Sequence, residues 1–201
     1  MEKQIISLFL TNKKLKFNEI EKLLHVRSNK LDYHLKKLIK KRIIEKDGNY
    51  YELTESSEYL IPYISGRNAI LPVVLIKIGN KNNIFLYKRE KRPYQGFLSL
   101  PGGRILIGEE IGDAVKRIMR ERHNINVIFK NINSISIEHL KKKNKTINSF
   151  LLIFVTANTK GKINLTDIEK YRKNIIKSDY NLIKKDHKKE IGISIINSSV
   201  D

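Results

Sequence analysis

The sequence predicts a two-domain protein of mixed α+β and α/β class. Residues 1–42 place apolar side chains at helical spacing, and Asp47-Gly48-Asn49 between two short apolar or aromatic runs predicts a β-hairpin. From Ala69 onward, β-branched runs predict strands around an amphipathic helix. The chain has 201 residues, of which 40% are hydrophobic, so it can build two small cores.

The composition favours a polyanionic partner. Lys and Arg number 40 against 21 Asp and Glu, which gives a formal net charge of +19. Nucleic acid is the expected partner for such an excess, although a coding bias toward Lys, Asn and Ile would produce it as well. The absence of Cys excludes disulfides and thiolate metal sites, and no apolar run reaches membrane-spanning length. The absence of Cys makes a cytoplasmic location the default expectation, and the N-terminus shows no signal-peptide pattern.

Three helices are expected in the first domain. The first covers residues 2–10, and the second begins at Asn18, an N-cap that Glu21 completes as a capping box. Ser28 caps the third helix, over residues 29–42. The apolar faces of the last two helices comprise Ile20, Leu23 and Leu24, and then Leu31, Leu35, Leu38 and Ile39.

Two strands, 43–46 and 50–53, flank the Asp-Gly turn. Three helices followed by a hairpin is the winged helix-turn-helix order, and SNKLDYHLKKLIKKRIIEKDGNYYELTE resembles the recognition helix and wing of ArsR- or MarR-like DNA-binding domains. The resemblance covers about residues 1–60 and implies a domain over residues 1–65 that binds double-stranded DNA. One helix of such a domain enters the major groove, and flanking cations neutralise phosphates. The expected DNA contacts are Arg27, Ser28, Asn29, Lys30, Tyr33, His34, Lys37 and Lys46.

Plainer interpretations of this module stay open. The basic helix face is compatible with simple solvation or with protein contacts, and His34 is compatible with a packed histidine. Residues 56–68 are expected to form a connector with a short apolar helix between the domains. The same segment is compatible with a homodimer, which palindromic operators require.

The second domain is expected to begin with two strands, 69–78 and 83–88, that form a hairpin. A basic loop, 89–96, leads to a strand, 97–100, a tight glycine-rich turn, 100–103, and a helix after Glu109. The apolar face of this helix comprises Ile111, Ala114, Val115, Ile118 and Met119. The remaining elements are strands at 126–138 and 149–156, a basic loop at 139–145, and helices at 167–185 and 187–196.

Four residues of this stretch, Gly103, Glu109, Arg117 and Glu121, match the Nudix box, G-x5-E-x7-R-E-U-x-E-E-x-G-U, in which U is a bulky aliphatic residue. The preceding LSLPGGRI is similar to the usual Nudix lead-in. The resemblance covers about residues 69–185 and implies a Nudix-like α/β/α sandwich with a mixed sheet, within a domain over residues 66–201.

The sequence departs from the Nudix pattern at three positions. Ile118 replaces the glutamate that follows the arginine, Arg122 replaces the second glutamate of the pair, and Asn124 replaces the closing glycine. In the family these glutamates hold a divalent metal and activate the attacking water. Because only Glu121 of the three is kept, the resemblance implies a domain whose hydrolytic machinery is damaged.

Site residues follow from the same resemblance. Glu121 is the catalytic residue if the domain is active, and Glu109 and Glu121 are the ligands of a weak Mg²⁺ or Mn²⁺ site. Arg122 offers a guanidinium to a diphosphate in place of the missing metal charge. The expected ligand-binding residues are Gly102, Gly103, Arg104, Arg117 and Arg122. Alternatively, Arg117 and Glu121 are an ordinary i, i+4 pair, and the glycines serve only a strand-to-helix turn.

Two functions fit these patterns. The first is a transcriptional regulator that binds DNA and uses the degenerate Nudix domain to bind a nucleoside-diphosphate-type effector, such as an ADP-ribose- or NAD-like compound. The alternative is a metal-dependent Nudix hydrolase that cleaves nucleoside diphosphates linked to another moiety.

Overall fold

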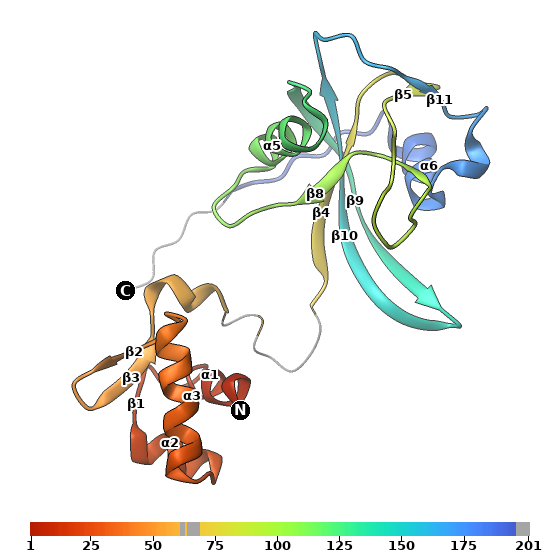
Figure 1. The fold of residues 1–201 in the computed structure, drawn as a ribbon. Helices are drawn as coiled ribbons and strands as arrows, with labels where there is room; N and C mark the ends of the chain where they lie inside the picture. Colours follow the sequence, from red (N-terminus) through yellow and green to blue (C-terminus); the bar gives the residue numbers. More distant parts are fainter. Residues whose placement is uncertain (61–62, 64–68, 196–201) are drawn as a thin grey trace. The chain divides into compact units, whose positions relative to one another are not determined.

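The computed structural model describes residues 1–60, 63 and 69–195. The chain divides into two compact units, Met1–Ala69 and Ile70–Asp201 (Figure 1). The expected boundary after residue 65, and much of the connector expected over residues 56–68, lie outside the described residues. In the described part of the chain, the structure has no helix that is both long enough and apolar enough to cross a membrane.

The first unit contains the three expected helices and the expected hairpin. Its elements are α1 (Glu2–Leu8), β1 (Lys14–Lys16), α2 (Phe17–Leu24), α3 (Ser28–Lys40), β2 (Ile44–Asp47), β3 (Tyr50–Leu53) and the 3-10 helix η1 (Glu55–Leu60). Strand β1 was not expected. It pairs antiparallel with β3, so the hairpin becomes a three-stranded sheet in the order β1-β3-β2.

A single cluster fills the core of the first unit. Its fully buried members include Ile5, Ile20, Leu31, Leu35 and Leu38. Two expected members, at positions 23 and 39, are 53% and 37% exposed, so that part of the prediction was wrong. A helix of 8 or 13 residues buries only a narrow stripe in so small a unit, and residues at the edge of the stripe stay in solvent.

Both expected N-caps in the first unit were wrong. Helix α2 begins at Phe17, and the backbone N–H of Lys16 donates to the Glu19 carboxylate at 2.7 Å. Helix α3 begins at Ser28 itself, whose hydroxyl donates to the Glu21 carboxylate. Helix α2 begins earlier than expected because the extended backbone of β1 continues to Lys16, so that Lys16 and not Asn18 takes the N-cap position.

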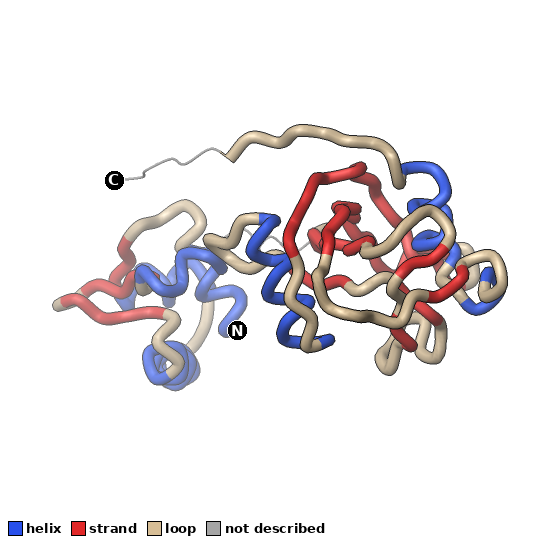
Figure 2. Tube along the Cα trace, turned by 90° about the horizontal axis from the view of Figure 1, so that it is seen from above, coloured by secondary structure: helices blue, strands red, loops and turns tan. Residues whose placement is uncertain are grey.

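The second unit is built on a four-stranded mixed sheet in the order β8-β4-β10-β9 (Figures 1 and 2). Strands β4 (Leu71–Lys77) and β10 (Lys145–Asn158) are parallel, whereas β8 (Gly102–Arg104) and β9 (Ile128–Lys142) are antiparallel to their neighbours. Helices α5 (Ile111–His123) and α6 (Lys177–Asp186) lie on opposite faces of the sheet. The expected mixed sheet between helices is therefore present.

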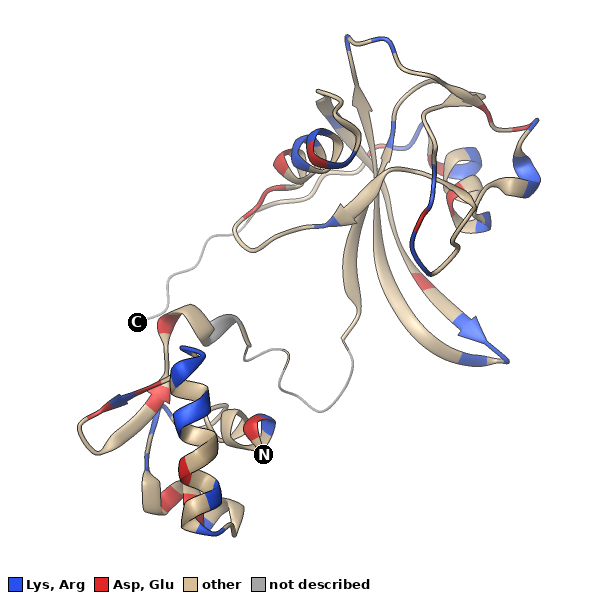
Figure 3. Ribbon diagram, viewed as in Figure 1, with Lys and Arg blue, Asp and Glu red and all other residues tan. Residues whose placement is uncertain are grey.

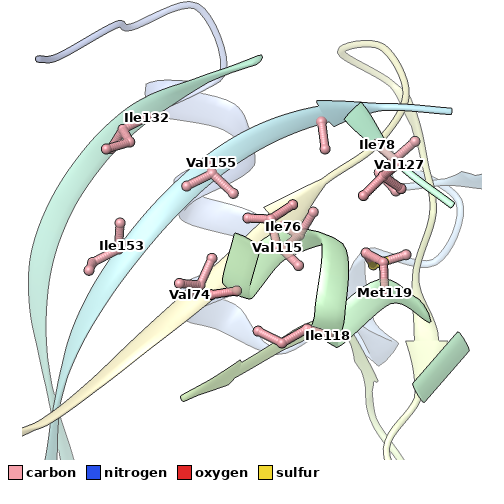
Figure 4. Packing of buried hydrophobic residues seen from close by; sticks show 12 residues of the cluster. Val74, Ile76, Ile78, Val115, Ile118, Met119, Val127, Ile132, Ile153 and Val155 are labelled. Carbon is pink, nitrogen blue, oxygen red and sulfur yellow. The ribbon is translucent and has the colours of Figure 1, made fainter. Parts of the chain in front are cut away.

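Alternation along the central strands produces one core on each face of the sheet. Val74 and Ile76 of β4 point toward α5, where they pack with Val115, Ile118 and Met119 (Figure 4). The intervening Leu75 points to the other face and joins a second cluster with Leu152, Phe154, Leu182 and Ile183. Side chains of a strand alternate between faces, so one central strand can fix a helix on each side.

Several short elements differ from expectation. The hairpin expected between 69–78 and 83–88 is present only next to its turn, where the Phe85 N–H donates to the Ile78 carbonyl at 2.9 Å and Gly79 bridges Ile84. The pairing does not continue along β4, because β5 (Asn83–Ile84) pairs with β11 (Thr166–Asp167) and β6 (Tyr87–Lys88) pairs with β7 (Leu98–Ser99). The basic segment 139–145 extends the long β9 and β10 strands instead of forming a loop, apart from the turn at its end.

The C-terminal region also differs. The helix expected over 167–185 is confined to α6, preceded by the 3-10 helix η2 (Arg172–Asn174), and residues 187–195 are not helical. They run along β9, where the Asn133 side chain donates to the carbonyls of His187 and Lys189 at 3.3 and 2.9 Å. The buried Lys77 ammonium donates to the His187 carbonyl at 3.1 Å, and burial lowers the pKa of Lys77.

Candidate functional site

Helix α5 forms where the Nudix-like motif predicted it. The expected apolar face is confirmed, since Ala114, Val115, Ile118 and Met119 are buried. The helix ends at Asn124, which has left-handed backbone geometry with φ of 54°. Asn tolerates this conformation better than most residues, so it can close the helix where the family has glycine.

Arg117 makes its main contacts with Glu109, not with Glu121. Its Nε and Nη2 atoms donate to the two Glu109 carboxylate oxygens at 2.6 and 2.8 Å, and Nη2 also donates to the Arg104 carbonyl at 3.0 Å. The hydrogen bonds from Arg117 hold the pKa of Glu109 below its ordinary value. The contact with Glu121 is only 3.5 Å long, and that carboxylate is 59% exposed. Arg117 and Glu109 therefore brace the loop that enters α5.

The two glycines belong to a strand, and the tight turn expected over residues 100–103 was wrong. Strand β8 pairs with β4 at the edge of the sheet. A Cβ at Gly102 would lie 2.5 Å from the Val74 carbonyl oxygen, and one at Gly103 would lie 3.0 Å from Ile118 Cδ1. Gly102 has no room for a side chain because β8 is pressed against the backbone of β4, and Gly103 fits closely against the Ile118 side chain of α5. The amides of both glycines lie in the strand and not at the start of the helix.

The donor set around the motif does not fit a divalent cation. Glu109 is bound by Arg117 and by the Leu106 N–H, at 2.9 Å, and the Asp113 carboxylate pairs with Lys116 at 2.9 Å. Ile118 lies in the core, where it offers no oxygen. Within residues 1–60, 63 and 69–195, no three His, Cys, Asp or Glu side chains are grouped closely enough to hold a metal ion. Mg²⁺ and Mn²⁺ prefer several oxygen ligands, which this arrangement does not provide.

A cavity of about 260 Å³ opens on the face of the sheet opposite α5. Leu75, Leu100 and Leu152 form part of its apolar wall. Four of the expected ligand-binding residues, Gly102, Gly103, Arg104 and Arg122, line it together. Arg122 reaches it at the sheet edge, where its Nη1 donates to the Gly102 carbonyl at 2.8 Å.

The other expected site residues lie elsewhere. Arg117 and Glu121 border a separate hollow beside the outer face of α5, and Glu109 borders a third hollow near residues 190–195. The structure therefore divides the predicted site: the residues at the sheet edge line the cavity on the face opposite α5, and the expected catalytic and metal-binding glutamates border the two other hollows.

Several cavity residues were not expected as ligand-binding residues from the motif. Arg89 donates from Nε to the carbonyls of Pro93 and Lys91 at 2.6 and 3.2 Å, which fixes its side chain at the cavity beside Tyr87 and Tyr94. From the sequence, Arg89 and Tyr94 belong to a basic loop that is compatible with contacts to phosphate or base and equally with simple solvation. Its position over the cavity depends on the pairing of β6 with β7.

Asp179 was not identified from the sequence. It lies in the first turn of α6, is buried, and accepts hydrogen bonds from the Ser99 hydroxyl at 2.9 Å and the Leu100 N–H at 2.8 Å. Burial raises the pKa of Asp179 to about 6, with a smaller contribution from the Glu138 charge, and the two hydrogen bonds oppose the rise. The cavity thus combines three arginines, two tyrosines and two acidic groups, at positions 138 and 179.

In the first unit, the expected DNA contacts fall into two groups. Arg27, Asn29, Lys30 and Tyr33 are exposed, the last to 63%. Lys46 is exposed on β2, with its ammonium 5.7 Å from the centroid of the Tyr51 ring. These side chains are accessible to a partner.

The remaining expected contacts are engaged within the unit. The Lys37 and Lys41 ammonium groups lie 2.7 and 2.6 Å from the Glu2 carboxylate, and their hydrogen bonds lower the pKa of Glu2 to about 2. His34 is half-buried, with Nδ1 4.0 Å from Glu2. The Ser28 hydroxyl is bound to Glu21. One acidic residue at the start of the chain therefore neutralises part of the basic face of α3.

Sequence comparison finds neither a family model nor a curated protein that matches the chain. Among solved structures, a Nudix hydrolase from Nitrosomonas europaea matches 65% of this chain and 98% of its own, with a TM-score of 0.51 and 14% identity. A Nudix-family hydrolase from Clostridium perfringens matches 59% and 96%, with a TM-score of 0.45 and 17% identity. The Nudix domain of Shewanella oneidensis NrtR, solved with ADP-ribose, matches 66% and 96%, with a TM-score of 0.45 and 18% identity. The first likeness shows that the chain contains the Nudix fold.

Proposed function

We propose that this protein is a DNA-binding transcriptional regulator whose Nudix-fold unit binds a nucleoside-diphosphate-type metabolite as its effector. The first unit acts as a winged helix-turn-helix domain. The second unit binds the effector in the cavity that Arg89, Arg104 and Arg122 line, without a need for turnover.

The chemistry of the cavity supports effector binding. Guanidinium groups bind diphosphate oxygens through paired, charge-assisted hydrogen bonds, and three arginines are among the residues that line this cavity. Tyr87 and Tyr94 add aromatic surface for a base or ribose. The volume, about 260 Å³, is just below the usual range of small-molecule sites, which begins near ~300 Å³.

The proposal rests chiefly on what occupies the glutamate positions of the motif and on what those residues contact. Ile118 is a core residue, Glu109 is committed to Arg117, and Arg122 places a permanent cation at the cavity. These substitutions favour binding of an anion without the carboxylates that hydrolysis requires. A binding domain of this kind has an evident use when it is linked to a DNA-binding unit.

The exposed part of α3 supports the DNA-binding role. Asn29, Lys30 and Tyr33 near its N-terminal end are free to reach base edges or phosphates in a major groove. Lys46 on the wing is available for a backbone contact. Regulation further requires that the effector bind the DNA-competent and DNA-incompetent states with different affinity, and the coupling between the two ligands is reciprocal.

Calorimetry with nucleotides such as ADP-ribose and NAD⁺, in EDTA and then in Mg²⁺, tests the effector site. Binding should occur in EDTA and should weaken at least about tenfold in Arg122→Ala, since a hydrogen bond to a charged group is worth roughly 1.5–3 kcal/mol. The matched control is Arg120→Ala on the same helix, which borders the other hollow. Equal affinity of both variants contradicts the assigned cavity.

A mobility-shift assay with DNA from upstream of the gene tests the regulator. Binding should be sequence-specific and should change when effector is added. Weak, sequence-independent binding that salt abolishes would contradict the proposed role as a transcriptional regulator. Metal-dependent release of a nucleoside monophosphate that Glu121→Gln abolishes would instead support the hydrolase alternative.

A further inference from the structure

The positive charge of the chain is concentrated in the second unit. Residues 1–69 contain 14 Lys and Arg against 9 Asp and Glu, whereas residues 70–201 contain 26 against 12. The net charges are therefore +5 and +14, and the unit proposed to bind DNA holds the smaller excess. A polyanion that binds this chain meets most of the charge outside the winged-helix unit.

Part of that charge lies at the end of an arm that extends beyond the sheet. Strand β10 pairs with β4 only over Phe150–Thr156, but it pairs with β9 as far as Lys145, opposite Lys142. Residues 138–149 therefore form a two-stranded hairpin, and no strand among the described residues pairs with its outer edges (Figure 1). The hydrogen bond between His139 Nδ1 and the Ser149 hydroxyl, at 2.8 Å, joins the two strands of the arm.

The hairpin tip, which we define as residues 141–145, consists of four lysines and one asparagine. The lysines, at positions 141, 142, 143 and 145, are all exposed, and Figure 3 shows a basic end to the arm. Lys142 and Lys145 are direct cross-strand partners, an arrangement that places like charges opposite each other and destabilises an isolated hairpin. Within the described ranges, no carboxylate forms an ion pair with any of the four.

We propose that the hairpin tip binds the sugar–phosphate backbone of duplex DNA, as a sequence-independent contact that adds to the readout by the first unit. Phosphates would relieve the repulsion between the facing lysines, and the arm presents its cations on long, flexible stems away from the sheet. A contact of this type increases affinity through counterion release and contributes no base specificity. The inference rests on the proposed function in that it takes duplex DNA as the partner.

The test replaces all four tip lysines with Gln in the full-length chain. Anisotropy titrations on a duplex without an operator measure the dissociation constant between about 50 and 200 mM salt. The plot of log K against log salt should become less steep by about 0.9 for each phosphate that the tip no longer neutralises, and so by up to about 3.6. The matched control removes the same charge from four other exposed lysines of this unit, Lys160, Lys162, Lys173 and Lys185.

Each outcome decides the point. A shallower slope in the tip variant, with the control close to wild type, supports the contact. Equal effects of both variants overturn it, because general charge then explains the binding. Lysine-dependent binding to phosphatidylglycerol vesicles without a change on DNA overturns it as well.

Failure of the proposed function gives a different pattern. Asn29→Ala in the first unit should abolish operator preference and leave the salt slope on non-specific duplex unchanged. If the tip variant alters the slope but no operator preference exists in the wild type, the hairpin contact stands and the regulator does not.

Discussion

Restoring the missing glutamate of the motif at Ile118 is expected to lower stability instead of creating a metal site. Ile118 is fully buried against Val74 and Met119, and its Cδ1 atom lies close to the backbone of Gly103. Ile118→Glu removes apolar burial worth about 1.5–3 kcal/mol. It also leaves a carboxyl group in the core at a further cost of about 1–3 kcal/mol. The unfolding free energy should therefore fall by about 2.5–6 kcal/mol, a large part of the roughly 5–15 kcal/mol of a typical domain.

Arg122, one turn later on α5, can relieve this cost only in part. Its Nη1 atom is already bound to the Gly102 carbonyl at 2.8 Å, so pairing with a new carboxylate would break that contact. The double variant Ile118→Glu with Arg122→Ala should accordingly be no more stable than the single variant. A double variant clearly more stable than Ile118→Glu alone would contradict this, because it would show that the cost comes from strain on the Arg122 guanidinium and not from the buried carboxyl group.

The assay is urea unfolding followed by circular dichroism, since the chain has no Trp. Ile118→Val should cost only about 0.5–1.5 kcal/mol. Ile118→Gln keeps the shape without the charge, and its difference from Ile118→Glu should shrink as the pH falls. The sign follows because burial raises the pKa of a carboxyl, so the native state keeps its proton at a pH where the unfolded state has lost it. A glutamate variant as stable as wild type that gains Mg²⁺-dependent hydrolysis would refute the burial of this position.

Three further outcomes are expected. The pKa of Asp179 rises from an ordinary 3.8 to about 6 on folding, so the native state binds more protons in that window and wild type loses about 3 kcal/mol of stability as the pH rises through it. Urea midpoints between about pH 4 and pH 6.5 should show this loss in wild type and not in Asp179→Asn. Gly102→Ala should cost about 1–3 kcal/mol by overpacking, measured by thermal melting, while Gly161→Ala, where a Cβ meets only ordinary contacts, should be near neutral. Glu2→Gln frees Lys37 of α3 and Lys41 directly after it, so the salt slope of duplex binding should steepen by up to about 1.8; an unchanged slope would mean that this side of α3 does not face DNA.

Local patterns were sufficient for the elements whose side chains are organised by one period. The apolar residues of α5 recur at helical spacing and all face the core, and the β2–β3 hairpin turns at Gly48 and Asn49, directly after Asp47. The departures from the Nudix pattern at positions 118 and 122 are also visible in the sequence alone. Each of these features depends on residues within a few positions of each other, so it requires no knowledge of distant neighbours.

The sequence by itself therefore determined the two segments of different character, the mixed-sheet unit around a helix, and the loss of motif glutamates. Tertiary structure alone decided which residues form a cavity. Asp179 accepts a hydrogen bond from Ser99, about 80 positions away. Arg117 pairs closely with Glu109, on the loop before α5, and only at 3.5 Å with Glu121, its neighbour on the helix. Gly102 and Gly103 lie in a strand because β8 pairs with the edge of β4, where the backbone of Val74 leaves no room for a side chain at Gly102. Such choices depend on hydrogen-bond partners and space that arise only when distant segments pack, and no spacing along the chain encodes them directly.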